Sequence, residues 1–335
     1  MLSLSRRTTL GALGAAAALP FLPARGEATG ALNFLAVGDW GRGGAFHQKE
    51  VAMRMGETAS ATHARFIVSV GDNFYEDGVA GIDDPAWVNS YERVYDAPAL
   101  QVPWYVALGN HDAESPGVRA PLAARYGVSP EACYYALDLA GLRFIFLDVA
   151  HWTSASGDTS PYLDPELHDR GQIRGMGPDA DQLAWLEREL QAADRPVALV
   201  SHTPLGYRAA YPMPTLPYGT PAEKRETSVV DVMGDVLQRQ TVRAMLRSCP
   251  RVKVAFSGHW HVSDMVVEDG IAFCQTASLR EYPFEFRVVD VAETTLRVST
   301  LGLSGAFQRQ SYIEAWGSSW IAGTPDNRSF EVQLD

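Results

Sequence analysis

Residues able to bind metal ions occur in five short motifs along the chain, GDW, GDNFY, GNHD, SHTP and GHWH. The motifs supply carboxylates, an amide, a phenol and imidazoles, from Asp39, Asp72, Tyr75, Asn110, His111, His202, His259 and His261. A single polar residue at the end of an apolar run is usually a turn former or a helix cap. Five such motifs in one chain are difficult to explain as separate turns, and together they predict a metal-binding site.

The spacing within two of the motifs is informative. Tyr75 comes three residues after Asp72, so it either fills partly buried surface, as most tyrosines do, or binds the same metal ion as Asp72. His259 and His261 stand two residues apart in a loop-like stretch, so that both imidazoles can face one ion. The rest of the sequence decides between packing and metal binding at Tyr75.

Each motif follows an apolar run of the kind found in buried strands, as in ALNFLAVGDW, ARFIVSVGDN, PWYVALGNHD, RPVALVSHTP and RVKVAFSGHW. Helix-like stretches at Gln48–Ser60 and Asp179–Ala192 lie between some of these runs. The alternation predicts a mostly parallel, buried sheet. Ligands of such sheets bind at the carboxyl ends of the strands, so all five motifs are expected along one edge.

A second group of apolar runs predicts hairpins. One turns at Ala140-Gly141, another at Asp269-Gly270, and residues 286–301 read as two further strands. We therefore expect an α/β fold in which two mixed β-sheets pack face to face with helices on their outer faces, in one domain of residues 29–335. Two long segments rich in Gly, Pro, Ser and Tyr, His151–Gly177 and Thr203–Asp231, are expected to be loops that face the substrate.

Taken in order, the motifs resemble those of the calcineurin-like metallophosphoesterase superfamily, over the span from Asp39 to His261. Within it, the chain resembles the purple acid phosphatases of the short, single-domain type. Most members of the superfamily have Asp-x-His as the first motif, whereas this chain has Gly41 in place of that histidine. In purple acid phosphatases the tyrosine of Gly-Asp-x-x-Tyr supplies the ligand instead, and Tyr75 stands at that position.

The resemblance implies two metal ions that share one carboxylate. The first ion takes Asp39, Tyr75, His261 and the bridging Asp72, and the second takes Asn110, His202, His259 and Asp72. Two carboxylates and a phenolate favour the hard cation Fe(III), and the neutral ligands of the second ion suit divalent Fe, Zn or Mn. The implied activity is hydrolysis of phosphomonoesters, as an acid phosphatase, by attack of a metal-bound hydroxide. His111 is the expected catalytic residue, in contact with the phosphate or protonating the leaving group, and Asp112 is a candidate for orienting it.

One position departs from the family pattern and leaves a catalytic role open. Short purple acid phosphatases have a histidine nine residues after the ligand that corresponds to His202, and Tyr211 stands there in this chain. The second proton-handling group is missing or is one of several residues in the two long segments: Tyr207, Arg208, Tyr211, His151 or His168. Two alternatives to a phosphomonoesterase are a phosphodiesterase of the same superfamily and a non-catalytic binding protein, although such proteins typically lose metal ligands.

The first residues read as an export signal and not as part of the fold. Residues 1–28 contain twin arginines, Arg6 and Arg7, followed by an apolar run and small residues, which resembles a twin-arginine signal. A short anchor or a disordered leader is the plainer interpretation. We expect the mature protein to be periplasmic or secreted and to lack a membrane span, with the twin-arginine machinery as its partner during export.

The net charge limits the classes of partner, and the cysteines allow two interpretations. The net charge is −12, and it becomes −15 without residues 1–26, which hold three arginines and no acid. An acidic surface argues against nucleic acid as a partner, but a local pair of cations still permits a small phosphorylated substrate. The three cysteines, Cys133, Cys249 and Cys274, are either buried thiols or include a Cys249–Cys274 disulfide.

Overall fold

The computed structural model describes residues 32–75, 78–113, 134–139, 141–149, 152–154, 159–160, 173–176, 180–205, 239–303 and 319–335. Two six-stranded sheets dominate this part of the chain. The export-signal prediction for residues 1–28 and the role of Cys133 lie outside it. No helix among the described residues combines the length and the apolar character needed to cross a membrane.

The first sheet is mixed and has its parallel strands at one side. Its order is β15 (Ser329–Gln333), β14 (Thr295–Gly302), β13 (Glu285–Val291), β1 (Leu32–Val37), β2 (Ile67–Ser69) and β3 (Trp104–Val106). The pairs β1–β2 and β2–β3 are parallel, whereas β13 pairs antiparallel with both β1 and β14. This sheet therefore carries the strands that precede the first three motifs.

The second sheet is also mixed, and its parallel strands lie at the centre. Its order is β11 (Asp264–Glu268), β12 (Ile271–Gln275), β10 (Val252–Ser257), β9 (Val197–Val200), β5 (Leu142–Phe146) and β4 (Tyr135–Leu139). The two predicted hairpins are confirmed as the antiparallel pairs β4–β5 and β11–β12. The SHTP and GHWH motifs follow β9 and β10.

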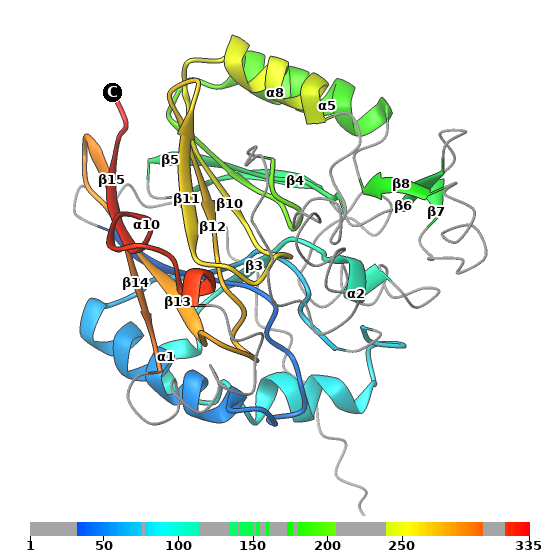
Figure 1. The fold of residues 1–335 in the computed structure, drawn as a ribbon, viewed down its shortest axis with the longest axis vertical. Helices are drawn as coiled ribbons and strands as arrows, with labels where there is room; N and C mark the ends of the chain where they lie inside the picture. The colour runs from blue at the N-terminus through cyan, green and yellow to red at the C-terminus, as the bar shows by residue number, and fades with distance from the viewer. Residues whose placement is uncertain are drawn as a thin grey trace, which may run out of the picture.

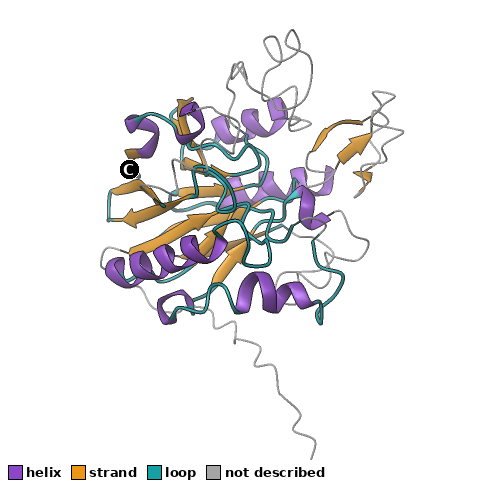
Figure 2. Ribbon diagram, turned by 60° about the horizontal axis from the view of Figure 1, so that its bottom comes forward, coloured by secondary structure: helices purple, strands orange, loops and turns teal. Residues whose placement is uncertain are grey.

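Helices cover the outer faces of both sheets, as predicted (Figure 1). Helix α1 (Gln48–Thr62) packs on the first sheet, and α5 (Ala180–Ala192) and α8 (Arg239–Ser248) pack on the second. The remaining helical segments are short: η1 (Trp87–Glu92), η2 (Pro98–Leu100), α2 (Asn110–Ala113), η3 (Ser319–Ala322) and α10 (Pro325–Arg328). Figure 2 shows the strands enclosed between helices on the two sides.

Strand β1 explains why the layers form. Phe34 and Ala36 face the core between the two sheets, while Leu35 and Val37 face the core beneath α1. All four are fully buried. A strand covered on both faces needs a continuous apolar run and not an alternating one, and residues 34–37, the last four of LNFLAV, form such a run.

The structure corrects two expectations and decides between two alternatives. The five motifs do not lie along one sheet edge, since β1, β2 and β3 belong to the first sheet and β9 and β10 to the second. Of the two alternatives for the cysteines, buried thiols are confirmed for Cys249 and Cys274, because both are free and lie in different apolar clusters. The segment 151–177 is not wholly loop, because it contains the small sheet of β7 (Thr159–Ser160), β6 (Trp152–Ser154) and β8 (Ile173–Met176).

Candidate metal centre

The motif residues converge where the ends of the two sheets meet. Asp39 follows β1, Asp72 follows β2, and His259 and His261 follow β10, and all four have positive φ angles of 54°, 50°, 67° and 54°. Left-handed backbone is uncommon outside glycine, and Asp and His tolerate it better than most residues. Such backbone typically occurs where a side chain has to be held in a functional position.

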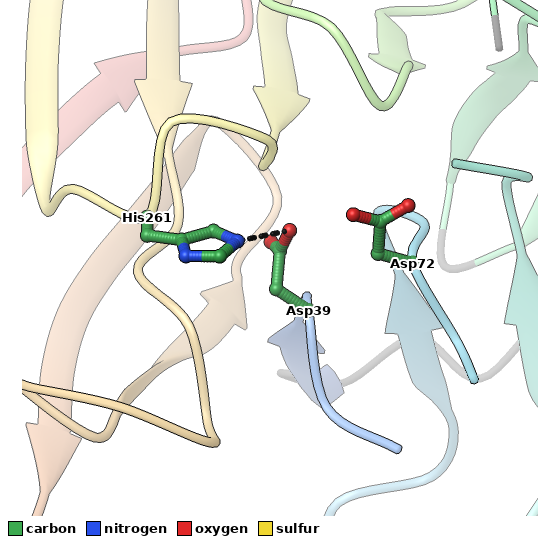
Figure 3. Close-up of side chains that lie close together, drawn as sticks. All are labelled: Asp39, Asp72 and His261. Atoms are coloured by element: carbon green, nitrogen blue, oxygen red, sulfur yellow. Dashed lines mark ion pairs between the residues drawn. The ribbon is translucent and has the colours of Figure 1, made fainter. Parts of the chain in front are cut away.

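Hydrogen bonds keep the first two motif loops together beyond the ends of their strands. The Asp39 amide donates to the Gly71 carbonyl at 3.0 Å, and the Trp40 amide donates to the Asp72 carbonyl at 3.1 Å. The Asp39 and Asp72 carboxylates are therefore fixed side by side, and both are buried. Figure 3 shows the His261 imidazole facing the Asp39 carboxylate, with the Asp72 carboxylate beside them.

Tyr75 completes a first group of four side chains. Its Oη lies 2.7 Å from Oδ2 of Asp72, 3.2 Å from Oδ1 of Asp39 and 3.2 Å from Nε2 of His261. His261 Nε2 is also 2.9 Å from Asp39 Oδ1. One ligand atom from each of Asp39, Asp72 and His261 lies within 4.8 Å of the others, a spacing that suits one metal ion. The residues expected at the first ion therefore occupy one place.

His202 organises a second group on the other side of Asp72. Its Nε2 lies 3.3 Å from Asp72 Oδ1 and 3.1 Å from Asn110 Oδ1. Its Nδ1 lies 3.0 Å from the Val70 carbonyl, so Nδ1 carries the proton and Nε2 is the nitrogen left to bind a metal. The His259 ring is 4.9 Å from the His202 ring. The residues expected at the second ion are thus also brought together.

The Asp72 carboxylate divides its two oxygens between the groups. Oδ2 faces Tyr75, and Oδ1 faces His202. The His111 amide donates to Oδ1 at 3.0 Å, and the His111 ring lies 4.4 Å from the Tyr75 ring. A carboxylate that presents one oxygen to each of two ligand groups has the arrangement a bridging ligand requires, with His111 next to it.

Several pKa values show how the centre balances its charge without a metal. Burial alone would lower the pKa of His261, but the Glu281 and Asp39 carboxylates raise it to about 10. Burial likewise opposes the effect of Asp72 on His202, whose pKa rises to about 9. Burial, with Asp72 and Asp39 next in importance, raises the pKa of Tyr75 well above its usual value. Protons on the two imidazoles therefore hold the positive charge that a metal ion would supply.

The donor set fits metal ions. Carboxylate, phenol and imidazole atoms crowd within hydrogen-bond distance of one another around Asp72, where burial makes uncompensated negative charge costly. Two carboxylates and a phenol suit a hard ion, and the amide and imidazole group suits a divalent ion. The fit rests on these atoms and their placement.

Asp112 has a structural role that its position in the sequence does not reveal. Its buried carboxylate accepts hydrogen bonds from the Asn73, Phe74 and Gly109 amides at 2.8–3.1 Å. It thereby joins the loop after β2 to the start of α2, which carries Asn110. Burial, followed by the charge of Asp72, raises the pKa of Asp112 to about 7, so a cation on Asp72 would remove part of that rise.

Glycines in the motifs leave space for the ligand side chains. A Cβ atom on Gly109 would lie 2.0 Å from Asp72 Oδ1, and one on Gly258 would lie 2.5 Å from Asp39 Oδ2. Such distances are far below van der Waals contact, so neither position accommodates a side chain without movement of a carboxylate. Gly109 and Gly258 are therefore part of the site.

The candidates for the second proton-handling group lie outside the described residues: Tyr207, Arg208, Tyr211, His151 and His168.

Comparison with known proteins finds one matching family model and several similar phosphatases. A family model described as calcineurin-like phosphoesterase matches residues 32–263. Purple acid phosphatase 4 of Arabidopsis thaliana is 48% identical over 83 residues, which is 25% of this chain and 24% of the relative. Tartrate-resistant acid phosphatase type 5 of Oryctolagus cuniculus is 32% identical over 199 residues, 55% of this chain and 59% of the relative. The matches thus span about a quarter of the plant relatives and less than two thirds of the rabbit protein.

Solved structures share the fold at low sequence identity. A dimetal phosphatase from Danio rerio superposes with a TM-score of 0.56 at 15% identity, covering 81% of this chain and 96% of its own. GAP50, described as the anchor in the inner membrane complex of Plasmodium, has a TM-score of 0.56 at 19% identity, covering 81% and 84%. At these identities the likeness establishes the fold alone.

Proposed function

The chain belongs to the calcineurin-like phosphoesterase family, and from this premise we propose that it hydrolyses phosphomonoesters at a dinuclear centre of Fe(III) and a divalent ion. The observation that carries the proposal is the Asp72 carboxylate, with one oxygen toward Tyr75 and the other toward His202. The partial matches to purple and tartrate-resistant acid phosphatases support the choice of substrate class.

The side chains of this centre have separate tasks. Asp39, Tyr75 and His261 would hold the ferric ion, and Asn110, His202 and His259 the divalent ion, with Asp72 shared by both. Metal ions held there would bind phosphate oxygens and would activate water for attack on phosphorus.

The protein itself contributes orientation and a proton. The Val70 carbonyl keeps His202 turned with Nε2 toward Asp72 and Asn110. His111 is half-buried, is joined to Asp72 through its amide, and lies beside the centre without belonging to the proposed ligand set. We assign it contact with the phosphate or protonation of the departing alkoxide.

A single tyrosine substitution tests the proposal. Wild-type protein should contain about two metal ions, including iron, and should be coloured, because a phenolate bound to Fe(III) absorbs visible light. Tyr75→Phe should abolish the colour. Tyr135→Phe is the matched control, because the Tyr135 hydroxyl donates to the Val106 carbonyl at the end of β3 and is not among the proposed metal ligands, so its removal should leave the colour unchanged.

Turnover and metal content decide between the alternatives. Wild-type protein should hydrolyse nitrophenyl phosphate faster than the corresponding nitrophenyl diester, and the reverse order would favour a phosphodiesterase. Metal-replete protein that hydrolyses neither ester would refute hydrolysis altogether and support a binding protein. A colourless, active protein that holds only zinc or manganese would remove the Fe(III) part of the proposal.

We also propose that the protein is exported by the twin-arginine route and works in the periplasm or outside the cell. The order of paired arginines, apolar run and small residues in positions 1–28 supports this. Replacement of Arg6 and Arg7 by lysine should retain the protein in the cytoplasm. Cell fractionation measures this, and unchanged export of the double variant would contradict the proposed route.

A further inference from the structure

The segment of residues 278–281, which follows β12, is attached to the loop that carries Asp39. Ser278 Oγ donates to the Asp39 carbonyl at 2.8 Å, and the Leu279 amide donates to the Gly38 carbonyl at 3.3 Å. Ser278 is fully buried and also forms an isolated bridge with Gly38. The backbone of the segment therefore has a fixed position beside the first group of proposed ligands.

Arg280 lies on the ring of Tyr75. Its guanidinium carbon is 3.8 Å from the ring centroid, and its side chain is 15% exposed. The Arg280 amide donates to Ser278 Oγ at 3.1 Å, which holds the residue in place. Its buried Nε has no hydrogen-bond partner in the described part of the protein. The guanidinium thus lies on the π-face of a proposed metal ligand, an interaction that draws electron density toward the positive charge, and its Nη1 is also 4.0 Å from Oε2 of Glu281.

Glu281, the next residue, faces a different proposed ligand. Its Oε1 is bonded to Nδ1 of His261, while Nε2 of the same ring points to Asp39 at 2.9 Å. A carboxylate that accepts a hydrogen bond from the non-ligating nitrogen of a metal-binding histidine fixes the tautomer of the ring. It also makes the imidazole a stronger electron donor to the metal. Glu281 therefore acts on His261 in the opposite electronic direction to the action of Arg280 on Tyr75.

We propose that Arg280 and Glu281 are positioning residues that set, in opposite directions, the electron donation of Tyr75 and His261 to the metal ion they hold with Asp39. The inference rests on the proposed function, because it requires the ferric ion at that position. Arg280 weakens the phenolate as a donor and so favours the reduced ion. Glu281 strengthens the imidazole as a donor and so favours the oxidised ion.

The test measures three properties of the iron-loaded protein: iron content, the position of the visible band and the one-electron reduction potential. Arg280→Met should shift the potential downward and move the band to longer wavelength, because the phenolate becomes the stronger donor. Glu281→Gln should shift the potential upward. Arg280→Lys keeps the charge without the planar guanidinium, so its shift should be smaller than that of Arg280→Met.

A matched control removes an arginine elsewhere. Arg243 on α8 forms a 2.7 Å ion pair with Glu268 on β11, away from the motif loops, so Arg243→Met should leave band and potential unchanged. Melting temperatures of all variants report whether the fold persists. Should Arg280→Met bind no iron, Arg280→Lys carries the test: recovery of iron and colour supports the role of the charge, and their loss overturns it.

The outcomes separate this inference from the proposed function. Opposite shifts of potential in Arg280→Met and Glu281→Gln support it. Coloured variants with the wild-type potential, or shifts in the same direction, overturn it while the proposed function stands. A colourless wild-type protein overturns the ferric centre and this inference with it.

Discussion

Substitution of Gly109 by alanine probes the Asp72 carboxylate, the proposed bridging ligand, without removing any polar group. A Cβ atom at this position would lie 2.0 Å from Oδ1 and 2.3 Å from the backbone nitrogen of Asp72. Restoring van der Waals contact requires a displacement of about 1.4 Å. Asp72 resists this, because it is buried, has left-handed backbone, and is bonded to Tyr75 and to the His111 amide.

The size of the effect follows from this geometry. Metal–ligand distances tolerate deviations of only about 0.2 Å, so a displacement several times larger should weaken binding. We expect metal affinity to fall by about 10–100-fold or more, because mutation of residues that hold metal ligands in position typically causes a loss of this size. Overpacking should also lower the free energy of unfolding by about 1–3 kcal/mol. The Gly109 amide, which donates to Asp112, is preserved in alanine, so the effect reports the steric displacement alone.

Competition with a chelator for zinc measures the affinity, and urea unfolding measures the stability. Gly81→Ala is the matched control, because nothing lies within 4 Å of a Cβ atom there and no positive φ is required. It should leave both properties unchanged. Gly109→Ala protein with wild-type zinc affinity would show that Asp72 is free to move or does not bind metal, and would refute the reasoning.

Two further predictions concern metal uptake and the core. Because the pKa of His202 is about 9 and that of His261 about 10 in the metal-free protein, both rings hold a proton at pH 7. Zinc binding at pH 7 should therefore release protons, and zinc affinity should rise with pH until the pH exceeds these pKa values. An indicator dye in weak buffer measures the proton release. Zinc binding without proton release would contradict the assignment of His202 and His261 as metal ligands. Phe34→Ala should lower the free energy of unfolding by about 3–5 kcal/mol, since the fully buried ring stacks on Phe66 at 4.8 Å. The exposed Met53→Ala should change it by less than about 0.5 kcal/mol, and equal losses in urea unfolding would place Phe34 outside the core.

The residues of the candidate site were recognisable because their signal is local. Each follows an apolar run that is long enough to read as a strand, and Asp72 with Tyr75 falls within five residues of sequence. The same holds for the helices α1 and α5 and for the hairpin turning at Asp269-Gly270, whose patterns lie within short windows.

The distribution of the motifs over two sheets was not predictable in this way. Strand order depends on which apolar faces pack together, and β1 pairs with β13, more than two hundred residues later in the chain. Local periodicity contains no information about that pairing. The expectation of a single sheet edge failed for this reason, although the prediction of two packed sheets was confirmed.

The residues around the proposed ligands were missed for a related reason. Asp112 was noticed only as a neighbour of His111, because its bonds to the Asn73 and Phe74 amides arise when β2 and β3 become adjacent. Glu281 reaches His261 across twenty residues that form a hairpin. Neither carboxylate has a spacing that distinguishes it from ordinary surface acids in the sequence.

The left-handed backbone at Asp39, Asp72, His259 and His261 limits how such a site can change by mutation. Asparagine, aspartate and histidine adopt this conformation more readily than most residues, and residues other than these and glycine incur about 1–2 kcal/mol. An Asp→Asn replacement therefore alters the charge without a free-energy cost from the backbone. An Asp→Glu replacement places the carboxylate further from the backbone, so it misplaces the ligand oxygen and also incurs the cost of the left-handed conformation. Mutations at these positions can thus change the net charge of the centre far more easily than the distances between its ligand atoms.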